Sequence, residues 1–478
     1  MPLDHPRTWP AALSRFRANS SPRRHWSEPK LPPELVELII DHLQDSPQNL
    51  KVCSLVARAW RTRCQGHLFR CVQVDIWSLP PAMLSIVKGR IIRRLKGISS
   101  EDRIVPFTQE LHIDTTTQRV GNRVSMHFMY RILSSLPPFT NLDTLTMNIP
   151  WNFHWEQYES AKQLPAQELS SCLSSLIKRS PRLEALSLQN PLFSSLDDVL
   201  TMMGFYSPRL GSLGIGNLST LSDEIRALST EQVRLWMEKK LACREARQVA
   251  LTTIYVGYLH ARIRDEILMH PNFIDWDTIQ SLNLYWEREI SSSCPTLLHR
   301  CLHHNLKELI LTLVCCTDIR KSLSLAWSYP SFNLLPIPKV TINVKPDQLP
   351  NLTRLRVCSE SVDMITAVLA PLIPASPFLS RIEVVLDWAI PGVRKIHKSH
   401  RNSPVTQRLD PILANWMEEL WPFWRCVYVD IYTLRGKLSS KELGVLFRMM
   451  LPQSTRSFPA FHFGKCTGSY HKGQCRGK

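Results

Sequence analysis

Apolar residues first recur with a helical period at residues 31–43 (LPPELVELIIDHL). The stripe consists of Leu31, Leu35, Val36, Leu38, Ile39, Ile40 and Leu43. Because residues three and four positions apart share one face of a helix, this spacing predicts an amphipathic helix. Pro32 and Pro33 suit its first turn, where no backbone donor is needed, and Asp45-Ser46-Pro47 would end it.

A second apolar stripe predicts a helix over residues 49–60, and a third helical stretch reaches Phe69. The second stripe contains Leu50, Cys53, Val56 and Trp60. At residues 71–76 (CVQVDI) the pattern changes to the alternation of a β-strand. Three short helices bury little surface by themselves, so we expect this small unit to need a partner for its apolar residues.

A shorter pattern recurs along the rest of the chain: apolar, two residues, apolar, one residue, apolar. The seven clear copies are Leu142/Leu145/Met147, Leu183/Leu186/Leu188, Leu210/Leu213/Ile215, Ile279/Leu282/Leu284, Leu306/Leu309/Leu311, Leu352/Leu355/Val357 and Leu379/Ile382/Val384. Weaker copies are Leu111/Ile113, Leu251/Ile254/Val256 and Val427/Val429. Turn sequences such as Ser-Pro-Arg and Leu-Pro-Asn often come just before. Each copy predicts a short strand whose alternate side chains point inward.

The spacing of these copies indicates stacked repeats. Between the middle residues of successive copies, four of the nine intervals are 27 or 28 residues, and the longer ones fit one repeat with an inserted loop. Apolar runs between the copies, such as 169–180 and 364–373, are predicted to be helices. Because one strand and one helix cannot bury their apolar faces alone, we expect an α/β fold with parallel strands on a concave side and helices on a convex side.

Residues 222–268 are the most ambiguous part of the chain. They could form two long helices, or a helix, a strand and a second helix. We favour the second arrangement, because Thr252–Val256 is a β-branched run that suits a strand.

Composition fits a folded chain in a reducing compartment. The 478 residues are 44% hydrophobic and 21% charged, which is ordinary for a globular protein. The 13 cysteines are scattered, with no C-x-x-C pair, so we expect thiols rather than a disulfide framework. No segment predicts a secretory signal or a membrane span. We therefore expect the protein in the cytoplasm, the nucleus or both.

The net charge of +17 is concentrated in a few segments. These are the N-terminal residues 1–30, the stretches 88–96 and 394–408, and the tail 461–478. We interpret the two internal stretches as solvated basic loops. Nucleic-acid binding or a nuclear-localisation signal is the alternative that we do not favour.

Residues 31–72 resemble an F-box. The resemblance rests on the ordered set Leu31-Pro32, Glu34-Leu35, Ile39-Ile40, Leu43, Leu50, Cys53-Ser54-Leu55-Val56, Trp60, Leu68-Phe69 and Val72. It implies that this segment binds a Skp-type adaptor, which in turn binds a cullin scaffold. By the same resemblance, the adaptor-binding surface would be formed by Leu31, Pro32, Leu35, Ile39, Leu43, Cys53, Val56 and Trp60.

The remaining repeats resemble irregular leucine-rich repeats of the kind that follow an F-box, notably in mushroom-forming fungi. The Asn or Cys that such repeats place after the strand is missing. Its positions hold Pro150, Pro191, Leu218, Glu287, Val314, Glu360 and Asp387. The domains implied are a disordered basic segment (1–30), the F-box (31–72), an irregular leucine-rich-repeat-like solenoid (73–460) and a disordered basic tail (461–478).

The resemblance implies a substrate-recognition adaptor of an SCF-type (Skp–cullin–F-box) ubiquitin ligase that would recruit a protein target for ubiquitin-dependent degradation. The alternative is a non-ligase scaffold whose repeats bind protein or nucleic acid and whose F-box is structural or vestigial. The sequence carries no Gly-rich phosphate loop and no H-E-x-x-H or G-x-S-x-G motif, so we expect no enzymatic activity and no cofactor. We also expect no metal, since the tail residues His462, Cys466, His471 and Cys475 lack the close cysteine pair of a zinc knuckle.

Overall fold

The computed structural model divides the chain into two compact units, with the division between Leu68 and Phe69. We call them the helical unit and the sheet unit. The residues described are 31–75, 105–114, 126–148, 163–189, 191–216, 219–220, 227–242, 248–256, 267–268, 270, 273–287, 302–314, 342, 344–345, 347–359, 362–389, 405–420, 428–435, 445, 448–449, 451–457 and 461–465. The expected N-terminal disordered segment and the basic stretch 88–96 lie outside these residues, as does most of the stretch 394–408.

The helical unit contains α1 (Pro33–His42), α2 (Pro47–Val56) and α3, which runs from Arg58 to Arg70 at the start of the sheet unit. Pro33 and Pro47 occupy the first turns of α1 and α2, as expected for a residue that lacks a backbone donor. The helix expected over 49–60 is in fact two helices, because Ala57 between them has an extended backbone. Alanine is a good helix former, so its residue type carries no signal for this break.

A small core and one polar clamp hold the helical unit together. The buried residues are Val36, Ile40, Leu50 and Cys64, and Leu43, Cys53, Trp60 and Leu68 pack against them. Asp41 of α1 accepts hydrogen bonds of 2.8 and 2.6 Å from the guanidinium of Arg63 on α3, and His67 Nε2 lies 2.7 Å from the same carboxylate. The bonds from Arg63, assisted by His67, hold the pKa of Asp41 well below its usual range.

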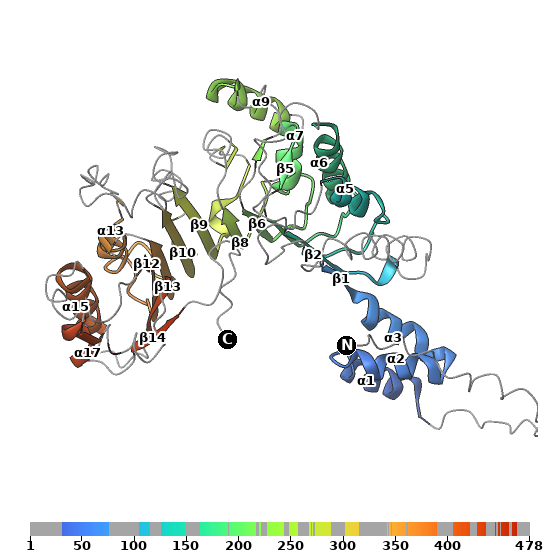
Figure 1. Ribbon diagram of the computed structural model, residues 1–478, viewed down its shortest axis with the longest axis horizontal. Helices are drawn as coiled ribbons and strands as arrows, with labels where there is room; N and C mark the ends of the chain where they lie inside the picture. Colours follow the sequence, from blue (N-terminus) through green and yellow to red (C-terminus); the bar gives the residue numbers. More distant parts are fainter. Residues whose placement is uncertain are drawn as a thin grey trace, which may run out of the picture. The chain divides into compact units, whose positions relative to one another are not determined.

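The sheet unit is built on one twelve-stranded parallel sheet with the order β1-β2-β3-β4-β6-β8-β9-β10-β11-β12-β13-β14 (Figure 1). The strands are β1 (Cys71–Asp75), β2 (Glu110–Asp114), β3 (Thr144–Asn148), β4 (Ala185–Gln189), β6 (Ser212–Gly216), β8 (Thr253–Val256), β9 (Ser281–Glu287), β10 (Glu308–Val314), β11 (Arg354–Ser359), β12 (Arg381–Ala389), β13 (Tyr428–Arg435) and β14 (Phe461–Lys465). Two short strands, β5 (Leu192–Phe193) and β7 (Ser219–Thr220), form a separate pair. The expected α/β class is confirmed.

The middle residues of the sequence pattern align across the sheet. Successive Cα partners are Leu111, Leu145, Leu186, Leu213, Ile254, Leu282, Leu309, Leu355 and Ile382. On β13 the partner of Ile382 is Val429, whereas the pattern had Val427 as the middle residue, which lies outside the described residues. From Leu111 to Ile382, each of these side chains is at most 1% exposed. In this register, corresponding residues of neighbouring parallel strands lie side by side. The resulting row of Leu and Ile side chains forms the centre of the core.

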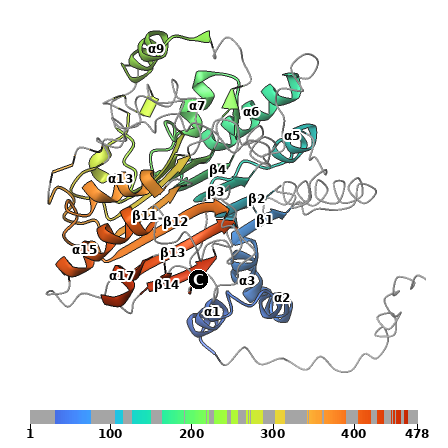
Figure 2. The ribbon, with the colours of Figure 1, turned by 60° about the vertical axis from the view of Figure 1, so that its left-hand side comes forward.

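Helices line one side of this sheet (Figure 2). They are α5 (Met126–Ser134), α6 (Gln163–Lys178), α7 (Leu196–Met202), α9 (Thr230–Ala242), α13 (Val362–Leu372), α15 (Asp410–Leu420) and α17 (Pro452–Ser457). Val105–Phe107 and Trp276–Thr278 form short 3-10 helices, and Val405–Leu409 forms a π-helix. In the ambiguous segment 222–268, α9 is followed by β8, so the strand that we favoured is present, and most of the expected second helix lies outside the described residues.

Two expected boundaries differ from the structure. The predicted F-box region extended from residue 31 to residue 72. However, Cys71 and Val72 belong to β1, which pairs with β2 in the sheet unit. The predicted disordered tail began at residue 461, but Phe461–Lys465 forms β14 against β13, so that part of the expectation is wrong. Residues 466–478 lie outside the described residues.

Asparagine side chains donate hydrogen bonds to backbone carbonyl groups in several turns, on the side of the sheet where the strands begin. Asn141, Asn305 and Asn351 each lie three residues before a strand. Their amides donate to the carbonyl oxygens of Pro106, Asp277 and His304 at 2.8, 2.7 and 2.6 Å. Each bond reaches back to the preceding turn, so these side chains tie neighbouring repeats together.

Buried carboxylates fix two pairs of neighbouring helices. Asp198 of α7 accepts hydrogen bonds from Ser170 and Ser174 of α6 at 2.9 and 2.7 Å, and it forms a capping box with Ser195. Asp410 of α15 accepts bonds from the backbone amide and the hydroxyl of Ser454 on α17 at 2.9 and 2.6 Å. These contacts satisfy acids that would otherwise be costly to bury.

Candidate functional site

The helical unit exposes many large apolar side chains. We call the following seven residues the exposed apolar set: Leu31, Leu35, Leu38, Ile39, Val52, Leu55 and Val56. Their exposed fractions range from 47% for Leu35 to 80% for Leu55. The set arises because α1 and α2 each turn one face to the small core and leave the opposite face open.

The eight residues that the sequence suggested for adaptor binding fall into two groups. Leu31, Pro32, Leu35, Ile39 and Val56 are exposed. Leu43, Cys53 and Trp60 are half-buried and pack against the core of the helical unit, so part of their surface supports the fold itself. Leu38, Val52 and Leu55 are exposed but were not in the suggested set.

The sheet unit has a different accessible face. Along β2, β3, β4 and β8, half-buried residues alternate with buried ones, so the face away from the core is partly open. A hollow of about 700 Å³ lies on this face, lined by strands from β1 to β10. Its uncharged lining residues include Thr144, Thr146, Asn148, Ser187, Gln189, Ser212, Gly214, Thr253, Tyr255, Ser281 and Asn283. Such a lining offers many hydrogen-bonding groups and little net charge.

One of the residues that line the hollow is a buried amide, Gln189. Gln189 is 8% exposed, and within the described part of the chain its Oε1 has no hydrogen-bond partner. Gly216 makes room for this side chain, since a Cβ atom at residue 216 would clash with it. Burial raises the pKa of Tyr255 on β8, two strands from Gln189, although a hydrogen bond with Gln189 opposes the shift.

A network of charged side chains lies on strands β10, β11 and β12 of the same sheet. Arg354 contacts Glu308 at 2.9 Å and Glu383 at 2.6 Å, and Arg381 contacts Glu383 at 3.0 Å. Arg356 lies 3.6 Å from the second oxygen of Glu383, whose side chain is only 3% exposed. Three guanidinium groups share the buried Glu383 carboxylate, so this acid is fully paired, and we interpret the network as structural support.

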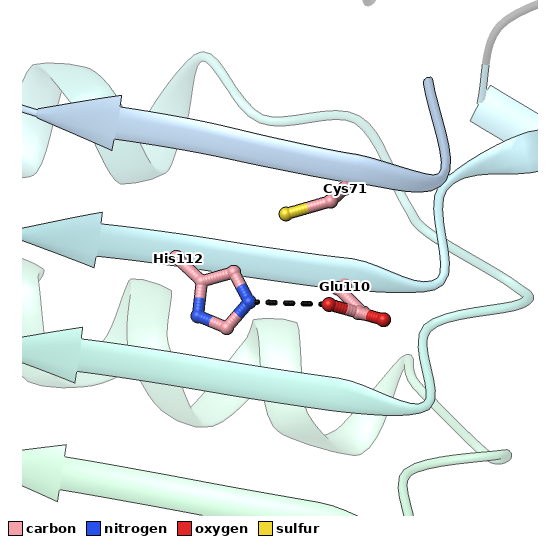
Figure 3. Close-up of side chains that lie close together, drawn as sticks. All are labelled: Cys71, Glu110 and His112. Carbon is pink, nitrogen blue, oxygen red and sulfur yellow. Dashed lines mark hydrogen bonds and ion pairs between the residues drawn. The ribbon is translucent and has the colours of Figure 1, made fainter. Parts of the chain in front are cut away.

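A mixed cluster of possible ligands lies at the edge of the sheet, on β1 and β2 (Figure 3). Within the described residues, Cys71, Glu110 and His112 are the one group of three whose ligand atoms all lie within 4.8 Å of one another. His112 Nε2 is 3.4 Å from Glu110 Oε2, and Arg70 Nε is 3.7 Å from Glu110 Oε1. Sequence reasoning missed this group because its members come from two strands and show no ligand spacing along the chain.

No helix in the described part of the chain is both long and apolar enough to cross a membrane. No protein-family model matches the chain, and no curated protein matches its sequence.

Proposed function

We propose that this chain is the substrate-recruiting subunit of an SCF-type ubiquitin ligase. The helical unit would act as an F-box and bind a Skp-type adaptor, which would connect it to a cullin scaffold. The sheet unit would act as an irregular leucine-rich-repeat solenoid that holds a protein target. The chain would carry out no chemistry itself, and its contribution would be the high effective concentration of the target near the ubiquitin-charged enzyme.

The exposed apolar set is the observation that carries this proposal. Large apolar residues are exposed at eleven positions among the described residues, and seven of these belong to the helical unit. Complete burial of one Val, Leu or Ile side chain contributes roughly 1.5–3 kcal/mol, so a partner that covers this set would gain several kcal/mol. The order of residues in 31–72, which resembles an F-box, supports a Skp-type adaptor as that partner.

The sheet unit supports the recruiting role less directly. Its repeated strands, aligned in register, agree with a leucine-rich-repeat-like solenoid. The hollow over β1 to β10 offers a target a surface whose residues are different from those of the exposed apolar set. The Asn or Cys ladder expected after each strand is replaced in part by Asn141, Asn305 and Asn351 before the strands.

Co-purification with a Skp-type adaptor tests the proposal. The wild-type chain and the double variant Leu35→Asp/Leu55→Asp would be compared, since both side chains are exposed and their replacement leaves the core intact. Leu235→Asp is the matched control, because Leu235 is 52% exposed on α9 in the sheet unit. We expect the wild type and the control to bind the adaptor and the double variant to lose binding.

The contrary outcome is equally clear. If the folded wild-type chain does not bind the adaptor, or if the folded double variant binds it as well as the wild type does, the ligase role is wrong. The chain would then be better described as a scaffold that acts through its sheet unit alone.

A further inference from the structure

We propose that Cys71, Glu110 and His112 form a zinc-binding site on the sheet unit. This site is independent of the adaptor function proposed above. It rests on the chemistry of the three side chains, on their fixed positions in the sheet, and on the distances between their ligand atoms.

The three residues come from neighbouring positions on one face of the sheet. Cys71, the first residue of β1, is the Cα partner of Glu110, the first residue of β2. His112 lies two residues further along β2, and side chains two residues apart point to the same side of a strand. The intervening Leu111 is buried in the core, so Glu110 and His112 face outward. In Figure 3 the Cys71 side chain lies between β1 and β2, and the His112 ring and the Glu110 carboxylate lie on the other side of β2 in this view.

The donor set is one that zinc prefers. A thiolate sulfur, an imidazole nitrogen and a carboxylate oxygen are the usual zinc ligands in proteins, at roughly 2.0–2.3 Å from the ion. The thiolate and the carboxylate together offset the charge of a divalent cation. Three protein ligands leave a fourth position of the tetrahedron to water.

The distances already approach those of a bound site. Ligand atoms around a tetrahedral zinc ion lie roughly 3.5 Å apart, given the usual zinc–ligand distances. His112 Nε2 and Glu110 Oε2 are 3.4 Å apart, and the sulfur of Cys71 lies within 4.8 Å of both residues' ligand atoms. Cys71 is exposed, so an ion can reach it from solvent.

Arg70 completes the arrangement. Its Nε lies 3.7 Å from Glu110 Oε1, whereas Oε2 of the same carboxylate faces His112. Arg70 therefore holds one oxygen of Glu110 and leaves the other toward His112, as groups that contact metal-binding carboxylates commonly do.

A bound ion would also have a structural consequence. β1 is an edge strand of the sheet and pairs only with β2 among the described strands. A metal held by one ligand from β1 and two from β2 would fasten this edge where the chain leaves α3. We therefore expect zinc to stabilise the pairing of β1 with β2.

Cobalt and zinc binding to the full-length, chelator-treated protein tests the site. Since the chain has 13 cysteines, the measurement compares variants rather than relying on the wild type alone. The wild type should bind Co²⁺ with a thiolate-to-cobalt charge-transfer band that zinc abolishes by displacement. Cys71→Ser should bind one equivalent less and lose that site's band. His112→Gln should bind zinc at least about tenfold more weakly.

Two controls and a second readout make the result decisive. Gln73→Ser changes the same face of β1, and Cys172→Ser removes a thiol on α6, and neither should alter the site. In the wild type, zinc should slow alkylation of Cys71 as followed by mass spectrometry, and His112→Gln should remove this protection. The proposal is overturned if the wild type binds neither metal, or if folded Cys71→Ser and His112→Gln retain wild-type stoichiometry and zinc leaves Cys71 alkylation unchanged.

Discussion

The two units of the molecule use their apolar residues in opposite ways. The helical unit buries four of them in its core and exposes the seven of the exposed apolar set. The sheet unit buries a continuous row of Leu and Ile side chains, and many of the residues that line its hollow carry hydroxyl or amide groups. An apolar pattern in the sequence can therefore indicate either a buried core or an exposed surface. In the sheet unit the pattern marks core residues. In the helical unit about half of the apolar residues are exposed on the surface.

The two units should differ most in how much stability they lose when a leucine is replaced by alanine. Leu309→Ala removes a fully buried side chain from the centre of the sheet and should lower the free energy of unfolding by roughly 2–5 kcal/mol. Leu55→Ala, at an 80% exposed position, should change it by less than about 0.5 kcal/mol. Urea denaturation measures both, and similar losses at the two positions would contradict the comparison.

A somewhat smaller loss is expected from Asp198→Ala in the sheet unit. Although burial opposes ionisation, hydrogen bonds from Ser174, Ser194 and Ser170 outweigh it and lower the pKa of Asp198. The substitution would leave the buried hydroxyls of Ser170 and Ser174 without their acceptor. We expect a loss of about 2–3 kcal/mol in the free energy of unfolding.

The same urea experiment has a matched control. Asp114→Ala replaces an acid that is only half-buried on β2, and it should cost less than Asp198→Ala. Equal losses would mean that the bonds between α6 and α7 do not contribute as described.

The turns between repeats should show a smaller effect. Asn351→Ala removes the 2.6 Å bond to the carbonyl of His304 at an exposed position. The expected loss is about 0.5–1.5 kcal/mol, the net contribution of one hydrogen bond. Hydrogen exchange should show faster exchange in β10 and β11, whereas exchange in the helical unit should not change.

The smallest effect concerns acid stability. Burial opposes ionisation of Asp197, but bonds from Lys178, Lys240 and Tyr206 outweigh it and lower its pKa from 3.8 to about 2. A lowered pKa in the folded state stabilises the fold above pH 3.8, and this contribution is lost as the pH falls through about 2. Asp197→Asn should therefore flatten the pH dependence of the melting temperature in this range. Because the side chain is partly exposed, the change should be small. If the variant's melting temperature depended on pH as steeply as that of the wild type, ionised Asp197 would not stabilise the fold.

Much of the sheet could be predicted because its signal is local and repeated. The row from Leu111 to Ile382 was identified as strand centres from spacing alone, and the register aligns these residues as partners. The break at Ala57 and strand β14 were missed, since neither residue type nor composition marks them. Both depend on packing between segments distant in sequence, which overrides local propensity.

The candidate surfaces were predicted less completely. Val56 and Trp60 both belong to the predicted apolar stripe, and only the packing of three helices shows that Val56 is exposed and Trp60 is half-buried. Cys71 and His112 have no recognisable spacing in the sequence, because the pairing of β1 with β2 brings them together. Sites assembled across strands need the register as well as the sequence.

Hydrogen exchange of the full-length chain, with and without a Skp-type adaptor, tests the central claim most directly. The account predicts that the adaptor slows exchange in α1 and α2, where the exposed apolar set lies, and leaves the sheet unit unchanged. The Leu35→Asp/Leu55→Asp variant should show no such protection, whereas Leu235→Asp should show all of it. Unchanged exchange in α1 and α2 at saturating adaptor, or protection confined to the sheet unit, would contradict the account.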